Sequence, residues 1–443
     1  MTDRITMSRR SAPRSARSLR ALGRVLPGVV ASSLLLGCGA DRAQRAATAS
    51  EPLQALDGAS WRKLPPIPSG TEPGPGQNGT MAVVQGRPYV ATITGSRRRF
   101  TGEILTLADG RWQRRVGGRR LDLGTAGTLT LAAYDGTICA GLDRRGLRVL
   151  CLRDGRWKSL GRRIWPSASR GGLGQLVAAG GVLYALRGFV DRQDRSRFSV
   201  SAYADGGWRD ASPPDELLGD QDLSMQPFAD GAVYCVGFQH VEGSTPPAIR
   251  VLCRRPDGGW AARGTEIPPS ALGVDVESAD LDSAASAGGV IFLSADVFRR
   301  DGSPSASLAQ PDTGRPKPQV DWTVFTTPDA TTGLSRSVRD VTEQGRLMSS
   351  GNLLWAYAFS QRLTQQGLQG WMDVRAMDPS TGQVRTVGQP LARRFRFNGP
   401  VDWELAADAD SVFALFTTAV HGVPGQSTKI GVARLVLAVG PSP

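Results

Sequence analysis

Residues 180–208 read GGVLYALRGFVDRQDRSRFSVSAYADGGW, and this stretch decides the fold. The pair Gly180-Gly181 opens an apolar run that reaches Leu186. A polar loop follows, and a second run leads through Asp205-Gly206 to Trp208. Such residue pairs allow the positive φ angles that two-residue hairpin turns require. The stretch therefore predicts short antiparallel strands that are joined by two tight turns.

The same pattern recurs along the chain at intervals of 45 to 63 residues, and each full repeat holds four short strands. Seven such sets predict a seven-bladed β-propeller, an all-β fold of four-stranded antiparallel blades that bury their faces on one another. The turns between first and second strands centre on Gln85-Gly86, Asp135-Gly136, Gly180-Gly181, Asp230-Gly231, Gly288-Gly289, Gly351-Asn352 and Asp410-Ser411. The turns between third and fourth strands lead to Trp61, Trp112, Trp157, Trp208 and Trp260, which we interpret as blade-packing residues rather than ligand platforms.

The two ends of the repeat region complement each other. Residues 59–64 resemble a lone fourth strand, whereas the last set, 403–439, lacks one. We therefore expect the N-terminal strand to complete the last blade, which closes the ring without a free sheet edge. The alternatives are a two-sheet sandwich and an array of hairpins.

One repeat also resembles a known family. Gly180 to Leu186, followed by Val200 to Tyr203 and Trp208, is similar to a kelch repeat. The resemblance is divergent, because Arg187-Gly188 stands where kelch repeats have two glycines. It implies a propeller fold, and a fold does not by itself imply a function.

The N-terminus has the features of an export signal. Its first 37 residues carry seven arginines and one aspartate, followed by the apolar run Val25 to Leu36, which is too short to span a bilayer. The ending Leu35-Leu36-Gly37-Cys38 resembles a bacterial lipobox, which implies acylation of Cys38 after cleavage. We predict a lipoprotein signal peptide over 1–37, a flexible tether over 38–56 and the propeller over 57–443. The alternative is an ordinary signal peptide that a cysteine follows by chance.

These features predict the location and partners of the protein. We expect the lipid on Cys38 to anchor the protein to a membrane of the cell envelope. An aspartate directly after the lipidated cysteine resembles a signal for retention in the inner membrane. This chain has Gly39 at that position, which favours the outer membrane in a cell with two membranes. The signal peptide contributes +6 of the net charge of +13, so nucleic-acid binding is not favoured. The sequence favours a monomer.

Four cysteines follow Cys38, and the repeat suggests how they pair. Cys139 and Cys151 lie in the second and third strands of one set, and Cys235 and Cys253 occupy the same strands of another. Neighbouring strands bring such residues near disulfide distance, so we predict the bonds Cys139–Cys151 and Cys235–Cys253. Disulfides are typical of an oxidising compartment outside the cytoplasm. The alternative is a pair of buried free thiols in each blade.

Residues for catalysis or metal binding are sparse. The two histidines, His240 and His421, fall between second and third strands and are interpreted as exposed loop residues. No catalytic motif is present, and no cofactor or metal site is predicted. A calcium site at Asp275-Val276-Glu277 is the one alternative, because hard cations prefer oxygen ligands.

Arginines gather in the loops that would share one face of a propeller. They predict binding of an anionic partner, such as a polysaccharide, a lipid headgroup or an acidic protein; the alternative is a set of solvated loops in an arginine-rich protein. The preferred function is a binding or scaffolding module without catalysis, and the alternative is a propeller hydrolase, lyase or oxidase that acts on extracellular glycans. The candidate arginines are Arg97, Arg98, Arg99, Arg119, Arg120, Arg144, Arg145, Arg162, Arg163, Arg192, Arg195, Arg197, Arg393, Arg394 and Arg396.

Overall fold

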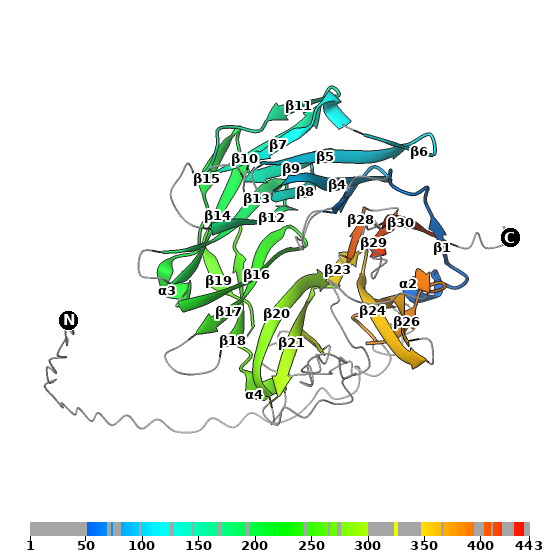
Figure 1. Cartoon of the computed structure of the whole chain (residues 1–443). Helices are drawn as coiled ribbons and strands as arrows, with labels where there is room; N and C mark the ends of the chain where they lie inside the picture. Colours follow the sequence, from blue (N-terminus) through cyan, green and yellow to red (C-terminus); the bar gives the residue numbers. More distant parts are fainter. Residues whose placement is uncertain are drawn as a thin grey trace, which may run out of the picture. The chain divides into compact units, whose positions relative to one another are not determined.

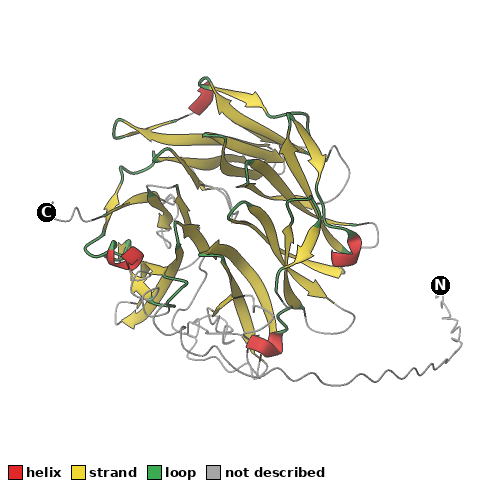
Figure 2. Cartoon of the chain, turned by 180° about the vertical axis from the view of Figure 1, so that it is seen from behind, coloured by secondary structure: helices red, strands yellow, loops and turns green. Residues whose placement is uncertain are grey.

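The computed structural model divides the chain into two compact units, Met1–Arg45 and Ala46–Pro443. The predicted signal peptide and Cys38 lie outside the described residues. Within the second unit the structure is built almost entirely of strands, with a few short helices between them (Figures 1 and 2). The described residues are 51–68, 72–73, 81–96, 99–114, 116–124, 128–143, 146–165, 171–191, 195–218, 220–241, 247–264, 266–272, 276–299, 323–326, 347–364, 367–393, 403–408, 411–418 and 429–437.

The first half of the propeller forms three antiparallel sheets. The first contains β3 (Met81–Val84), β4 (Arg87–Ser96), β5 (Arg99–Ala108) and β6 (Arg111–Gln113), with β2 (Glu72–Pro73) on β4 and β7 (Leu121–Gly124) on β5. The second contains β8 (Thr128–Tyr134), β9 (Thr137–Asp143), β10 (Leu147–Arg153) and β11 (Arg156–Ser159). The third contains β12 (Gly171–Ala179), β13 (Val182–Val190), β14 (Ser196–Ala204), β15 (Gly207–Asp210), β16 (Asp220–Asp230), β17 (Val233–Val241), β18 (Ala248–Arg254) and β19 (Trp260–Ala262).

The second half forms three more sheets. The fourth contains β20 (Val276–Ala287), β21 (Val290–Arg299) and β22 (Thr323–Thr326). The fifth contains β23 (Leu347–Ser350), β24 (Leu353–Thr364), β25 (Gly367–Met377), β26 (Val384–Thr386) and β27 (Ala392–Arg393). The sixth contains β28 (Trp403–Ala407), β29 (Val412–Thr418), β30 (Lys429–Val436) and β1 (Ser60–Lys63). The short helices are α2 (Glu51–Gln54), the 3₁₀ turn η1 (Val116–Gly118), α3 (Asp215–Leu218) and α4 (Pro269–Leu272).

The prediction of seven blades is wrong, because the described residues form six sheets. Two of the predicted blades, over 171–210 and 220–262, belong to one eight-stranded sheet. They join where Ser196 of β14 pairs with Gln221 of β16. The pairing pattern is otherwise as expected, with antiparallel neighbours in sequence order.

The sheets follow one another around a closed ring (Figure 1). The first strands of successive strand sets contact each other in chain order, from β3 through β8, β12, β16, β20 and β23 to β28, and β28 contacts β3. The eight-stranded sheet contributes two of these strands, β12 and β16. Hydrophobic clusters fill the spaces between neighbouring sheets; one joins Val83 and Val90 of the first sheet to Phe413 and Leu415 of the last.

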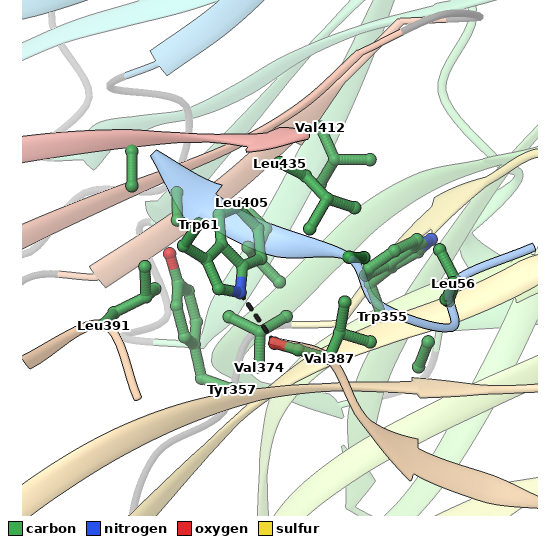
Figure 3. Packing of buried hydrophobic residues seen from close by; sticks show 14 of the residues in the cluster. Leu56, Trp61, Trp355, Tyr357, Val374, Val387, Leu391, Leu405, Val412 and Leu435 are labelled. Carbon is green, nitrogen blue, oxygen red and sulfur yellow. Dashed lines mark hydrogen bonds between the residues drawn. The ribbon is translucent and has the colours of Figure 1, made fainter. Parts of the chain in front are cut away.

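The chain ends meet in the last sheet, as the sequence predicts. The N-terminal strand β1 pairs with β30, with Trp61 opposite Leu435. Trp61 is 4% exposed and packs among Trp355, Leu405 and Val412 (Figure 3). The carboxylate of Glu404 in β28 also accepts the Met81 N–H of β3 at 2.9 Å. Both ends of the repeat region therefore contribute to closure.

Residues 51–56, which the sequence assigns to the tether, pack against this closure. They include α2, and Leu53 and Leu56 are buried in the same hydrophobic cluster as Trp61. Arg385 hydrogen-bonds the Leu53 carbonyl at 3.1 Å and pairs with Asp57. The packed part of the chain therefore begins before Asp57. Among the described residues, no helix is long and apolar enough to cross a bilayer.

The turn pattern has the backbone geometry that the sequence predicts. Asp135-Gly136 has φ angles of 51° and 67°, and Asp205-Gly206 has 51° and 78°, as the mirror-image turns of two-residue hairpins require. One turn is displaced: Gly231 and Ala232, rather than Asp230 and Gly231, connect β16 to β17.

Five tryptophans each tie their strand set to the one before it. Each indole N–H donates to a backbone carbonyl that follows the last strand of the preceding set, which confirms the packing interpretation. The bonds run from Trp61 to Val387 (2.8 Å), Trp112 to Pro65 (2.7 Å), Trp157 to Val116 (2.5 Å), Trp208 to Leu160 (2.6 Å) and Trp260 to Ala211 (3.0 Å).

Both predicted disulfides are present. Cys139 of β9 lies directly opposite Cys151 of β10, and Cys235 of β17 lies opposite Cys253 of β18. All four cysteines are buried. Each bond therefore links the second and third strands of its set.

Candidate anion-binding pocket

A cavity of about 170 Å³ opens between the first and second sheets. Its polar lining consists of Arg119, Arg120, Arg148, Arg163 and Asp122. Three leucines, Leu121, Leu142 and Leu150, complete the lining, and each is buried. The cavity thus combines an apolar floor with four guanidinium groups and one carboxylate.

The segment that carries Arg119 and Arg120 is fixed by the neighbouring sheet. Trp157 of β11 donates its indole N–H to the Val116 carbonyl in η1 at 2.5 Å. Gly117 has a φ of 75°, and a Cβ there would lie 2.4 Å from Trp157 Cδ1. Only glycine fits this close approach, so the tryptophan holds η1, and with it one side of the pocket, against the second sheet.

A buried carboxylate orients Arg120. Glu103 of β5 has no exposed area, yet its Oε1 accepts Arg120 Nε at 2.5 Å and its Oε2 accepts Arg114 Nη2 at 2.7 Å. Burial alone raises the pKa of Glu103, but the hydrogen bonds and charges of Arg114 and Arg120 outweigh it and hold the pKa below its ordinary value of 4.5. Glu103 is therefore ionised at neutral pH.

This lowered pKa predicts a pH effect on stability. A carboxyl group with a lower pKa in the folded than in the unfolded state stabilises the fold above its ordinary pKa, and this contribution falls as the pH drops through the lowered value. Between about pH 6 and about pH 3, we expect the free energy of unfolding to fall by about 1 to 2 kcal/mol more in wild type than in Glu103→Gln. Urea unfolding at both pH values measures this difference, and parallel losses in the two proteins would contradict it.

The opposite side of the pocket comes from β10 and the connection after β11. Leu147 and Ile164 form an isolated antiparallel bridge, which places the connection containing Arg163 beside the end of β10 that carries Arg148. In this strand set, the end of β10 that follows the second-to-third-strand loop therefore lies beside the connection to the next set, and Ile249 and Ile267 form the same bridge between the start of β18 and the connection after β19. Arg148 and Arg163 are exposed, and no described acidic residue forms an ion pair with either.

The structure gathers only some of the predicted binding arginines. Arg119, Arg120 and Arg163 line the pocket, whereas Arg195 lies elsewhere and pairs with Asp191 at 2.9 Å. Arg148 was missed, although its exposed place between buried Leu147 and Val149 was a signal in the strand pattern. Arg162 is exposed after β11, Arg197 lies in β14 beside Asp191, Arg99 begins β5 and Arg393 ends β27. The remaining candidates, Arg97, Arg98, Arg144, Arg145, Arg192, Arg394 and Arg396, lie outside the described residues.

His240 differs from its prediction as an exposed loop residue. It lies in β17 and is 7% exposed, because strand β17 extends further than the sequence indicates. Its Nδ1 lies 2.7 Å from Glu266 Oε1, and Arg250 Nη2 donates to Glu266 Oε2 at 3.2 Å. A carboxylate on Nδ1 orients an imidazole ring and fixes which nitrogen carries the proton. His421 lies outside the described residues.

No metal-binding group is found in the part of the chain that the structure describes. Three or more His, Cys, Asp or Glu side chains do not converge there. Asp275 of the proposed calcium site is outside the described residues, and Glu277 lies in β20.

Comparison with solved structures supports the architecture. The chain is similar in fold to the polysaccharide lyase Uly1, with a TM-score of 0.50 and 11% identity over 82% of this chain and 90% of that one. This chain is a β-propeller. The propeller domain of the Trilobed protease from Pyrococcus furiosus gives a TM-score of 0.44 at 10% identity, over 76% and 88% of the two chains. The phage phi92 endosialidase gives a TM-score of 0.43 at 11% identity, over 86% of this chain and 70% of that one.

The similarity to Uly1 supports the fold of the chain and says nothing of its activity. No family model matches the sequence of the propeller, and no curated protein is similar to it. The kelch resemblance therefore stays a prediction.

Proposed function

We propose that this chain is an exported, lipid-anchored protein whose propeller binds an anionic polysaccharide. The supporting observation is the convergence of Arg119, Arg120, Arg148 and Arg163 on one cavity. Arginine holds its charge at every physiological pH and binds anionic oxygens through paired N–H donors. The fold shared with a polysaccharide lyase is consistent with a glycan as the polymer.

Charge recognition predicts salt-dependent binding. The full chain in detergent should bind anionic polysaccharides and leave neutral dextran unbound, and its affinity should fall steeply as salt is added, because ions screen exposed charges. Affinity electrophoresis in gels that contain each polymer measures this. Equal retardation by charged and neutral polymers, or binding to acidic proteins alone, would reject the proposal.

The lipid anchor is tested independently at Cys38. In a bacterial host fed a palmitate analogue, the wild-type chain should take up label and fractionate with membranes, because acyl chains partition into the bilayer. Cys38→Ser should take up no label, whereas Ser33→Ala, which leaves Leu35 to Cys38 intact, should behave like wild type. Labelling of Cys38→Ser would reject acylation at this cysteine.

A second candidate is an enzyme that cleaves the same polymer. The observation behind it is the His240–Glu266 pair, since a carboxylate on Nδ1 orients an imidazole, the side chain that most often transfers protons in enzymes. The full chain would then release new sugar ends from an acidic polysaccharide, and His240→Gln would lower that rate at least a hundredfold. Binding without release of sugar ends favours the binding module.

A further inference from the structure

We infer, resting on the proposed function, that the pocket between β7 and β9–β10 binds the carboxylate of one acidic sugar unit within a polysaccharide chain. Its volume of about 170 Å³ is smaller than the roughly 300–1,000 Å³ of pockets that enclose whole small-molecule ligands. The pocket therefore accepts one unit, while the rest of the polymer lies along the surface.

The guanidinium groups differ in how they are held. Arg120 uses its Nε for Glu103, which leaves its two terminal nitrogens to donate from a fixed position. Trp157 holds η1 directly before Arg119. Arg148 and Arg163 stand on the other side without a described acidic partner. An entering anion thus meets one guanidinium that Glu103 holds in place and three, those of Arg119, Arg148 and Arg163, that form no ion pair with a described carboxylate.

The remaining lining discriminates among anions. The planar fork of arginine matches the two oxygens of a carboxylate. Asp122 adds a negative charge to the lining, which disfavours a ligand with several charges. Its Oδ1 accepts the Gly124 N–H at 3.0 Å, and a carboxylate has further lone pairs that can accept a sugar hydroxyl. Leu121, Leu142 and Leu150 offer an apolar surface to the C–H face of a ring. A singly charged ring with neighbouring hydroxyl groups satisfies all three features.

The test measures binding of the full chain, in detergent, to polygalacturonate. Arg148→Ala and Arg163→Ala should each weaken binding about tenfold or more, because each removes a charged hydrogen-bond donor. Arg148→Lys keeps the charge but loses the fork, so it should lose most of the same affinity. Arg111→Ala and Arg156→Ala are matched controls, since both are exposed arginines beside the third-to-fourth-strand turns, and they should bind like wild type.

Three further polymers separate the outcomes. Methyl-esterified polygalacturonate should not bind, and equal binding of it would overturn the carboxylate assignment. Dextran sulfate should bind more weakly, with no loss in Arg148→Ala beyond that of the Arg156→Ala control. Binding of dextran sulfate without binding of polygalacturonate would contradict this inference but not the proposed function. Failure of wild type to bind any anionic polymer would contradict both. Unchanged melting temperatures of the arginine variants show that each loss reflects binding.

Discussion

Replacing Cys139, Cys151, Cys235 and Cys253 by alanine will lower the free energy of unfolding by about 6 kcal/mol. The two disulfides close loops with sequence separations of 12 and 18 residues. A cross-link over about 15 residues removes roughly 3 kcal/mol of chain entropy from the unfolded state. Urea unfolding of wild type and the fourfold variant, without reductant, measures the difference.

The paired variants and a reductant provide the controls. Cys139→Ala/Cys151→Ala and Cys235→Ala/Cys253→Ala should each account for about half of the loss, because the bonds lie in different sheets and act independently. Dithiothreitol should bring wild type close to the fourfold variant and leave that variant unchanged. If the urea midpoint of wild type stayed the same with reductant, the bonds would not stabilise the fold.

Trp61→Ala will lower the free energy of unfolding by about 3 to 5 kcal/mol, which is typical for a buried aromatic residue. Its indole packs against Leu405 and Val412 and donates to the Val387 carbonyl at 2.8 Å (Figure 3). The substitution removes both the packing and the hydrogen bond at the point where the ring closes. Thermal and urea unfolding measure the loss.

Two related variants separate the contributions. Trp61→Phe keeps most of the apolar contact and should lose only about 1 to 2 kcal/mol with the hydrogen bond. Trp112→Ala tests the equivalent but more exposed tryptophan, whose partner is the Pro65 carbonyl, and should cost less than Trp61→Ala. If both alanine variants lost the same small amount, the N-terminal strand would not be the closure of this propeller.

Much of the fold could be predicted from the sequence because short-range chemistry repeats in register. Asp-Gly pairs specify hairpin turns through positive φ, and cysteines in the same strands of two sets specify their partners. The number of sheets could not be predicted. One backbone pairing, between Ser196 and Gln221, merges two strand sets, and a backbone hydrogen bond leaves no mark on side-chain identity.

The pocket, too, could be predicted from the sequence only in part. Loop arginines such as Arg119 and Arg163 are visible as charge clusters, but Arg148 lies within a strand and lines the pocket only because the fold brings β10 beside the segment before β7. Glu103 stands next to the apolar run Ile104 to Leu107, and its charge alone would place it at the surface. Its burial depends on Arg114 and Arg120, which follow after a turn and reach back to it. Nothing in the sequence indicates that a carbonyl shortly after a fourth strand, such as that of Val116, accepts a tryptophan hydrogen bond.

The pairing of β1 with β30 has a consequence for how the protein is made. Trp61 and the carbonyl that it binds are 326 residues apart, so at roughly 5–20 residues per second the first strand leaves the ribosome tens of seconds before its partners exist. During that time its edge is open to other chains. Because β30 lies between β1 and β29, a premature stop codon before Lys429 would leave β1 without a neighbour and expose one edge of β29, so we expect the truncated chain to aggregate.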